Sequence, residues 1–249
     1  MDRYFSRWIL NLVIATCICL PAYAQPGSNL KITHLMGDFY IYTTYNLYKG
    51  AKIPANGMYL VTNEGVALFD SPWDTTQFQP LLDSIRVRHG KKVVFCLATH
   101  FHNDRTAGLE YYASQGVRTY TTTRTDALSK KEGMKRAQFL IAKDTTIHLG
   151  GYSFEVVYPG EGHTKDNIVV WFGKERIIYG ACLIKSFEDK DLGFLGDANT
   201  KAYATTLRVV QQKCPKPNYV IVGHGNWSST SSLEHSIKMA DALLEKKIP

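Results

Sequence analysis

Residues 93–105 read Val-Val-Phe-Cys-Leu-Ala-Thr-His-Phe-His-Asn-Asp-Arg, and this stretch decides the fold that we expect. Its first six residues are apolar and include β-branched valines, which is typical of a strand buried on both faces. The loop that follows places His100, His102 and Asp104 at alternating positions. Because α/β folds place their sites at strand ends, the stretch predicts a site where two imidazoles and a carboxylate face one point.

The rest of the chain repeats strand pairs that are followed by a helix and a further strand. Hydrophobic periodicity predicts strands at residues 38–45, 58–62, 66–69, 147–149, 152–158, 168–172, 177–184 and 219–222. It predicts a helix from Phe78 that Gly90 ends, helices at 109–115, 125–132 and 200–212, and a last helix from Ser231. The N-terminal and C-terminal halves of the chain thus have the same pattern of elements, and no Pro- or Ser-rich linker separates them. This pattern predicts one α/β domain, a sandwich with its helices outside.

The first 24 residues have the pattern of a cleaved export signal. Arg3 and Arg7 precede a mostly apolar run at 8–20, which is too short to span a bilayer comfortably. An Ala-Tyr-Ala motif that ends at Ala24 is typical of a signal-peptidase site. We therefore expect a signal peptide at residues 1–24, a mature domain at residues 25–249 and a periplasmic location. A membrane anchor is the alternative.

Composition narrows the class of protein. The 249 residues are 45% hydrophobic and 20% charged with a formal charge of +7, which excludes collagen-like and disordered chains. Without the signal the charge falls to +6, and three cysteines remain, Cys96, Cys182 and Cys214. Three thiols cannot all pair with one another, so at least one is free or otherwise engaged. The basic segments 86–92 and 130–136 lack interleaved aromatics, so we expect solvated faces and no nucleic-acid partner.

Three further potential ligands stand near predicted strand ends. His163 precedes a strand, Cys182 lies near the end of another, and His224 follows a third. Zinc accepts nitrogen, sulfur and oxygen donors, and catalytic zinc commonly has three protein ligands plus water. Six candidate ligands therefore divide naturally into two sites. We expect the remaining histidines to be surface or hydrogen-bonded residues, and they are His34, His89, His148 and His235.

Taken in order, these motifs resemble those of the metallo-β-lactamases. The matching segments are His100-x-His102-x-Asp104-Arg105, Gly162-His163-Thr164, Gly180-Ala181-Cys182-Leu183-Ile184-Lys185, Gly223-His224-Gly225 and Phe69-Asp70-Ser71-Pro72-Trp73. Cys182 and Arg105 make the resemblance specific, since glyoxalase-like and nuclease-like relatives usually carry a bridging Asp and a His there. The resemblance implies a four-layer αβ/βα sandwich and a subclass with two different zinc sites.

By that resemblance, His100, His102 and His163 would hold one Zn2+ and Asp104, Cys182 and His224 a second. Three neutral imidazoles leave a zinc ion electron-poor, so that its bound water can reach a pKa of about 7. The implied function is zinc-dependent hydrolysis of the β-lactam ring of penicillins, cephalosporins and carbapenems, which gives antibiotic resistance. The implied partner is the β-lactam alone, bound by a monomer without a membrane anchor.

The resemblance also implies roles for residues around the metals. Asp104 would be catalytic as well as a ligand, and Lys185 would bind the substrate carboxylate. Arg105 and Asp70 would support the ligands from behind, and a capping role is the alternative for Asp70. Many family members have Asn where this chain has Phe194, which cannot donate a hydrogen bond, so we expect efficiency to differ between substrates.

Other functions remain open from the residues alone. A segment at 47–54, with Tyr48 and Ile53, resembles the family's mobile hairpin beside the site. An ordinary exposed loop is the alternative interpretation of this segment. The same scaffold could hydrolyse lactones, thioesters or phosphodiesters. A zinc-binding or nucleic-acid-binding module without catalysis is the alternative from a different class.

Overall fold

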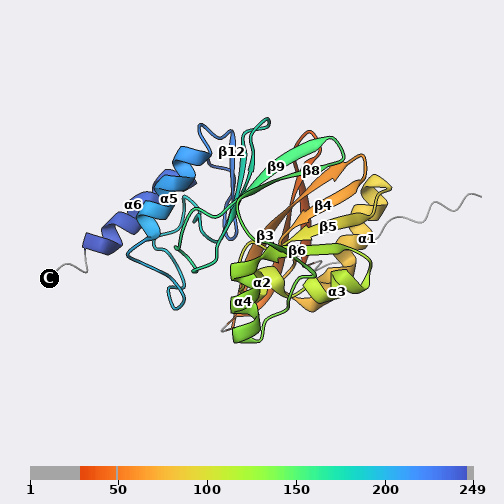
Figure 1. The fold of residues 1–249 in the computed structure, drawn as a ribbon, viewed down its shortest axis with the longest axis horizontal. Coiled ribbons are helices and arrows are strands. Elements are labelled where there is room, and N and C mark those ends of the chain that lie inside the picture. Colours follow the sequence, from red (N-terminus) through yellow and green to blue (C-terminus); the bar gives the residue numbers. More distant parts are fainter. Residues whose placement is uncertain (1–28, 49, 246–249) are drawn as a thin grey trace, which may run out of the picture.

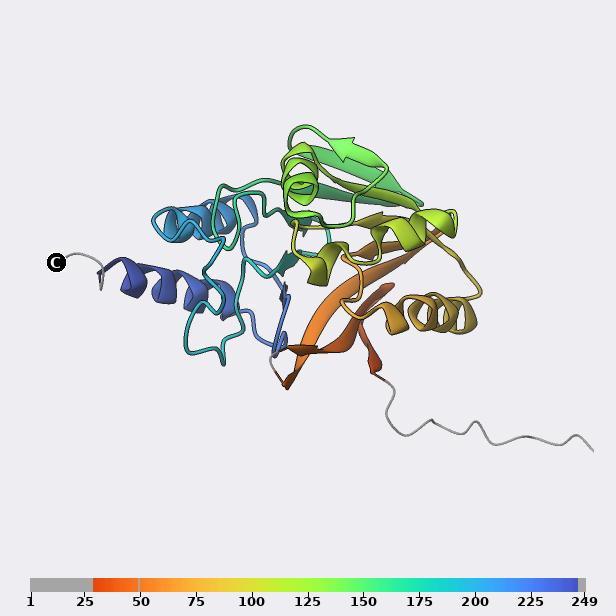
Figure 2. The ribbon, with the colours of Figure 1, turned by 90° about the horizontal axis from the view of Figure 1, so that it is seen from below.

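The computed structural model describes residues 29–48 and 50–245. Two β-sheets pack face to face, and helices cover the outer face of each sheet (Figure 1). Figure 2 shows the same layers from below, with α5 and α6 at one end of the molecule and α1 at the other. The expected αβ/βα sandwich is therefore confirmed. The predicted signal peptide lies outside the described residues.

The first sheet has seven strands in the order of the sequence. They are β1 (Leu30–Met36), β2 (Phe39–Tyr48), β3 (Ala51–Thr62), β4 (Gly65–Phe69), β5 (Val93–Leu97), β6 (Arg118–Thr122) and β7 (Phe139–Ile141). Pairing is antiparallel from β1 to β4 and parallel from β4 to β7. The parallel strands bring the ends of β4 and β5 to one edge, where the site lies.

The second sheet has five strands in the order β12-β11-β10-β9-β8. Their bounds are β8 (Thr145–Leu149), β9 (Tyr152–Val157), β10 (Val169–Phe172), β11 (Ile177–Ala181) and β12 (Tyr219–Val222). Only the pairing of β11 with β12 is parallel. These two strands therefore end at the same edge.

Helices form the two outer layers. They are α1 (Phe78–His89), α2 (Asn103–Thr106), α3 (Leu109–Ser114), α4 (Thr123–Glu132), α5 (Tyr203–Lys213) and α6 (Ser232–Glu245), with a short 3-10 helix at Thr75–Gln77. Helix α1 ends as predicted at Gly90, whose left-handed φ of 65° lets its N–H donate to the Arg86 carbonyl. The amphipathic spacing of its apolar residues buries Leu81 and Ile85 against the first sheet.

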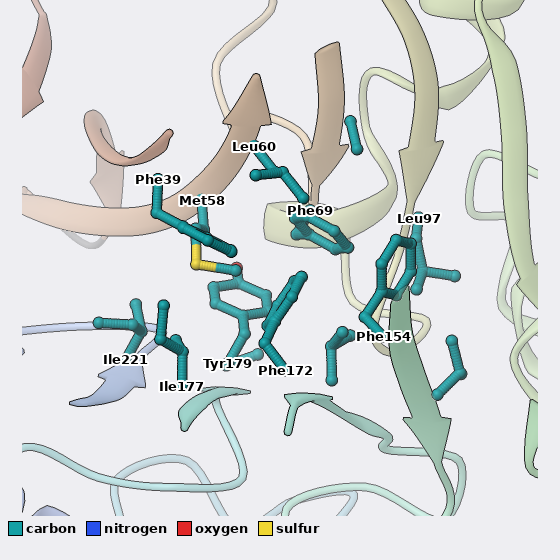
Figure 3. Packing of buried hydrophobic residues seen from close by; sticks show 14 of the residues in the cluster. Phe39, Met58, Leu60, Phe69, Leu97, Phe154, Phe172, Ile177, Tyr179 and Ile221 are labelled. Carbon is teal, nitrogen blue, oxygen red and sulfur yellow. The ribbon is translucent and has the colours of Figure 1, made fainter. Parts of the chain in front are cut away.

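The core between the sheets is aromatic. Figure 3 shows Phe39, Met58 and Phe69 of the first sheet pointing toward Phe172 and Tyr179 of the second. The rings of Phe69 and Phe172 meet edge to face with centroids 5.4 Å apart. Such pairs stabilise a core by about 0.5–1.5 kcal/mol beyond the area that they bury. This contact packs β4 of the first sheet against β10 of the second. It thereby helps to hold the two sheets, and the halves of the site that they carry, in place relative to each other.

Several boundaries differ from the expectation. Strand β3 begins at Ala51 rather than at residue 58, because pairing with β2 carries it through Pro54 and Gly57. Strand β11 ends at Ala181 rather than at residue 184, so Cys182 lies just after the strand. The sequence did not indicate β1, β6 or β7; β1 and β7 are the edge strands of the first sheet, and β6 pairs with β5 and β7.

Candidate metal centre and active site

The predicted ligands meet at one edge of the sandwich. His100, His102 and Asp104 follow β5, Cys182 follows β11, and His224 follows β12. A cavity of about 750 Å³ lies at this edge. His163, which comes from the loop between β9 and β10, lines this cavity. The structure thus brings together side chains that are up to 124 residues apart in the chain.

Three histidines form the first group. The ligating atoms of His100, His102 and His163 all lie within 4.8 Å of one another. His100 Nδ1 lies 3.2 Å from the Thr99 hydroxyl, while His100 Nε2 and His163 Nδ1 are buried without a hydrogen-bond partner. Burial lowers the pKa of His100 and of His163 well below the usual value, with further lowering by nearby charges. Both rings are therefore neutral at neutral pH, which is the form that binds a metal.

Asp104, Cys182 and His224 form the second group. Cys182 Sγ lies 3.6 Å from Asp104 Oδ2, and His224 Nε2 lies 3.0 Å from the same oxygen. His224 Nδ1 faces the Pro54 carbonyl at 2.7 Å, which directs Nε2 toward the group. Burial lowers the pKa of His224, but Cys182 and Asp104 outweigh it and raise that pKa to about 10. In the absence of a metal, Cys182 and Asp104 thus favour the protonated form of His224. A metal cation bound by the same three side chains could take the place of that proton.

These donors fit zinc. Zinc takes imidazole nitrogen, thiolate sulfur and carboxylate oxygen, and the two groups offer all three. Buried polar atoms are nearly always hydrogen-bonded, so the unpartnered nitrogens of His100 and His163 suit a role as metal ligands. His100, Asp104 and Cys182 also meet within 4.8 Å, so the two groups are contiguous. The arrangement could hold two ions side by side.

Arg105 lies behind the second group and is only 1% exposed. Its guanidinium lies 2.9 Å from Asp104 Oδ2 and donates to the carbonyls of Asn56 (2.7 Å) and Gly223 (3.0 Å). Burial opposes ionisation of Asp104, but this guanidinium holds the pKa of Asp104 well below its usual value. Arg105 therefore keeps the carboxylate ionised and fixes the strand ends around it.

Asp70 follows β4 and links the first sheet to the second through hydrogen bonds. Its carboxylate accepts hydrogen bonds from the Thr99 N–H (2.7 Å), the Thr99 hydroxyl (3.0 Å) and the Tyr179 hydroxyl (2.6 Å). Burial raises its pKa to about 6, although Arg105 at 3.5 Å and the hydrogen bonds from Tyr179 and Thr99 lower it. The positive φ of 64° at Asp70 turns the chain so that this carboxylate points inward.

Sequence reasoning missed two residues, one that bonds to the backbone around a ligand and one that contacts a ligand directly. Asn56 is buried in β3, and its amide donates to the carbonyls of Val222 and Gly225, on either side of His224. Asp197 accepts a hydrogen bond from His102. A buried Asn within a largely apolar strand was a signal for the first. Nothing local distinguished Asp197 from other exposed acids.

Lys185 provides a cation inside the cavity. Its side chain is buried beside the ligands, and it lines the same cavity as Cys182 and His163. Burial lowers the pKa of Lys185, while the charges of Cys182 and Asp189 oppose that shift. A buried ammonium of this kind binds an anionic group more strongly than an exposed lysine does.

Part of the remaining cavity wall is aromatic. Tyr48 and Trp73 meet with ring centroids 5.8 Å apart, and Ile53 lies on the same hairpin as Tyr48. Phe194 is 56% exposed and approaches the His102 ring at 5.9 Å. An exposed aromatic ring inside a cavity indicates a surface for an apolar ligand group.

The other histidines and cysteines are not among the residues that line the cavity. His34, His89 and His235 are hydrogen-bonded to Gly37, Tyr59 and Asp189, and His148 is exposed. Cys96 and Cys214 are buried and free. Among the helices in residues 29–48 and 50–245, none is long and apolar enough to cross a membrane.

Comparison with known proteins agrees with this geometry. Residues 52–224 match the Metallo-beta-lactamase superfamily. The chain belongs to this family. A metallo-beta-lactamase type 2 from Elizabethkingia meningoseptica is 40% identical over 241 residues, which cover 97% of this chain and 96% of the relative. Metallo-beta-lactamase IND-1 from Chryseobacterium indologenes is 38% identical over 86% of this chain and 87% of its own length.

Solved structures of the family superpose closely on the chain. The crystal structure of metallo-beta-lactamase IND-7 matches with a TM-score of 0.83 at 36% identity, over 87% of this chain and all of that one. A metallo-beta-lactamase from Pontibacter korlensis matches with a TM-score of 0.82 at 33% identity, over 85% and 99% of the two chains. The expected family and single-domain fold are confirmed.

Proposed function

We propose that this chain hydrolyses the β-lactam ring of antibiotics with zinc bound at the six converging ligands, and so gives resistance. It is a hydrolase of the metallo-β-lactamase family, as its relatives over nearly the whole chain are. The observation that carries the proposal is the pair of adjoining groups, one of three histidines and one of Asp104, Cys182 and His224. We infer that each group binds one Zn2+.

The ligands differ in the charge that they provide. Bound zinc supplies Lewis acidity toward the lactam carbonyl and a nucleophile at neutral pH. His100 and His163 are held neutral by burial, so they leave the first site electron-poor. Asp104 and Cys182 bring negative charge to the second, and Arg105 keeps Asp104 ionised. Asp104 is therefore the ligand whose charge and orientation most directly shape the reacting centre.

Lys185 orients the substrate. β-Lactams carry a carboxylate near the ring nitrogen, and the buried Lys185 lines the same cavity as the ligand cluster. A charge-assisted hydrogen bond to that carboxylate places the lactam ring over the ligands. The Tyr48–Trp73 pair and Phe194 then contact the apolar substituents of the antibiotic.

Alternative functions gain no support from the relatives. Those described above are all named metallo-beta-lactamases. In the basic segment 130–136, Lys131 pairs with Glu132, Lys135 with Glu110 and Arg136 with Asp126, and in the segment 86–92 Arg86 pairs with Asp83. Hydrolysis of lactones, thioesters or phosphodiesters, or a non-catalytic zinc module, is therefore not proposed. Signal cleavage after Ala24, a periplasmic location and a monomeric state stay predictions from the sequence.

Expression of the full chain in a susceptible Gram-negative host tests this proposal. We expect the minimum inhibitory concentrations of a penicillin and a carbapenem to rise, and the His100→Ala variant to abolish the rise. Edman sequencing of the protein from the periplasmic fraction should start at Gln25. Purified protein that hydrolyses neither antibiotic would contradict the function. Activity in purified protein with no resistance in the host would contradict only the export prediction.

A further inference from the structure

The balance of charge in the cavity differs from that of the chain. The sequence has a formal charge of +7. Among the described residues that line the cavity, however, carboxylates outnumber lysines, and these residues are Asp104, Glu132, Lys185, Asp189, Lys190, Asp191 and Asp197. Asp104 is a predicted zinc ligand, so a metal ion would balance its charge. The other charged side chains decide what a charged group of a substrate meets in the cavity.

Three of the remaining carboxylates have their recorded hydrogen bonds within the loop that follows Lys185 or with a predicted ligand. Asp189 and Asp191 each accept from a backbone N–H of that loop, those of Ser186 at 2.9 Å and Gly193 at 2.8 Å. The third contact joins Asp197 to His102 at 2.9 Å. These carboxylates therefore hold the loop in place, and part of their charge is shared with the donors.

Glu132 enters the cavity from a different element. It is the last residue of α4, and its side chain is 42% exposed. Its recorded partner is the ammonium of Lys131 at 2.7 Å, which is 74% exposed and is not among the residues that line the cavity. Exposed pairs of this kind contribute little to stability. A cationic group of a ligand could therefore replace Lys131 beside Glu132 at little cost.

The end of α4 has a fixed position close to the three-histidine group. Gly133 ends the helix in a left-handed conformation with φ of 68°. The hydrogen bond to Glu132 raises the pKa of Lys131, and the charge of Asp197 raises it further. Asp197 also bonds to His102, so the end of α4 lies near this predicted ligand. The negative end of the helix dipole adds to the charge of Glu132 there.

The proposed substrate places its variable group on the side of the cavity away from Lys185. Lys185 is only 8% exposed, and it is the cation assigned to the carboxylate near the ring nitrogen. In penicillins the acylamino side chain is attached to the carbon next to the lactam carbonyl, on the opposite side of the ring from that carboxylate. With the carbonyl over the ligands, the side chain extends toward the walls that include Glu132.

We propose that Glu132 is a specificity-determining residue that favours β-lactams with a cationic side chain over those with an anionic one. The inference rests on the proposed β-lactam hydrolysis. A carboxylate at the rim of a binding site attracts an ammonium group and repels a second carboxylate. Charges at a rim act mainly on the rate of association and on its salt dependence. The preference should therefore appear in kcat/KM and shrink as the salt concentration rises.

Three penicillins with the same aromatic side chain test the inference. Ampicillin carries an amino group on the side-chain carbon where carbenicillin carries a carboxylate, and benzylpenicillin carries neither. At a pH of about 6.5 the amino group is protonated, because the pKa of an α-amino group is about 7.7–8.0. The kcat/KM values for ampicillin and carbenicillin, each divided by that for benzylpenicillin, give the charge preference of each variant.

The zinc-loaded wild type should prefer ampicillin to carbenicillin. We expect Glu132→Gln to lower the ratio of the two normalised values about three- to tenfold, since attraction of one substrate and repulsion of the other each contribute a few-fold factor. Lys131→Ala removes the ammonium that partly neutralises Glu132 and should raise the ratio. Glu110→Gln is the matched control, because Glu110 pairs with the exposed Lys135 outside the cavity, and it should leave the ratio unchanged.

Salt separates an effect of charge from an effect of shape. Raising the ionic strength from about 0.01 M to about 1 M shortens the Debye length from about 30 Å to about 3 Å. The difference in ratio between the wild type and Glu132→Gln should then nearly disappear. A difference that persists at high salt would overturn the inference, as would equal ratios in the two proteins at low salt.

Failure of the inference can be told apart from failure of the proposed function. Hydrolysis of all three penicillins with a ratio that neither Glu132→Gln nor Lys131→Ala changes would remove the role of Glu132 and leave the function. Zinc-loaded protein that hydrolyses none of the three would remove the function, and the preference with it.

Discussion

At the scale of single residues, two lysines in one cavity have different surroundings. Lys185 is buried beside the ligand cluster, whereas Lys190 is exposed at the rim. We expect Lys185→Ala to raise KM for β-lactams about 10- to 100-fold, since a hydrogen bond between charged groups contributes about 1.5–3 kcal/mol. Lys190→Ala should change KM less than about threefold, as exposed pairs contribute little. Steady-state kinetics with benzylpenicillin would measure both, and equal effects of the two substitutions would refute the role of Lys185.

Phe194 should determine selectivity between substrates. Its ring is exposed in the cavity and cannot donate a hydrogen bond to a substrate carbonyl. Phe194→Asn adds a donor and removes an apolar wall, so we expect kcat/KM to change by different factors for different β-lactams, up to about tenfold. The ratio of kcat/KM between a penicillin with an aromatic substituent and a small carbapenem is the measurement. Unchanged kinetics across several β-lactams would show that the residue has no such role.

Asp70 should make stability depend on pH. Its pKa rises from 3.8 in the unfolded chain to about 6 in the fold. Between these values the folded protein binds the proton that the unfolded chain releases, so the contribution of Asp70 to stability falls as pH rises from about 4 to about 6. The size is on the order of 2–3 kcal/mol.

Asp70→Asn should remove this dependence. Urea unfolding of zinc-free wild type and variant at pH 4 to 7 would compare them, because the amide does not titrate in this range. The wild type is expected to lose stability relative to the variant over that interval. A constant difference between the two proteins would mean that burial does not raise the pKa of Asp70.

At the scale of secondary-structure elements, Asn56 joins the two sheets. Its buried amide in β3 donates to the Val222 carbonyl (3.1 Å) at the end of β12 and to the Gly225 carbonyl (2.9 Å). Asn56→Ala leaves the buried Val222 carbonyl and the part-buried Gly225 carbonyl short of a donor, so we expect a loss of about 1–3 kcal/mol and weaker zinc binding at the group that contains His224. Asn63→Ala, at an exposed turn, should change stability by less than about 0.5 kcal/mol. Denaturant unfolding and zinc titration would test this, and equal stability of the two variants would contradict it.

Elements with a strong local pattern could be predicted from the sequence. Helix α1 and the strand β5 have clear apolar spacing, and both lie within a residue or two of the expected positions. Strand β6 could not be predicted, because its sequence Arg-Thr-Tyr-Thr-Thr has no apolar alternation. Its threonines are satisfied by tertiary partners, as when the Thr121 hydroxyl donates to the Ala98 carbonyl. Such partners are not visible in a local pattern.

The residues of the site likewise divide into those that the sequence predicts and those that it does not. His100, His102 and Asp104 follow a single strand, so their spacing indicated one site directly. Asn56 and Asp197 act through residues that lie 166 and 95 positions away in the chain. Only the packing of two sheets and a loop brings them to the ligands. Sequence reasoning therefore found the ligands that share motifs and missed the residues that hold them.

At the scale of the whole molecule, each sheet supplies part of the ligand set. The first sheet carries His100, His102 and Asp104, and the second carries Cys182 and His224. A ligand that bridges them stabilises only the folded state, by about 4 kcal/mol at a free concentration 1,000 times its Kd. The fold and the metal centre are thus expected to depend on each other.

The central claim is that this whole assembly is a zinc-dependent β-lactam hydrolase. Turnover of nitrocefin and of a carbapenem by purified protein, before and after treatment with a chelator, tests it most directly. We predict hydrolysis of both substrates, a loss of more than about 100-fold when zinc is removed, and recovery when about two equivalents are returned. Hydrolysis that survives complete zinc removal, or zinc-loaded protein that opens neither ring, would contradict the account.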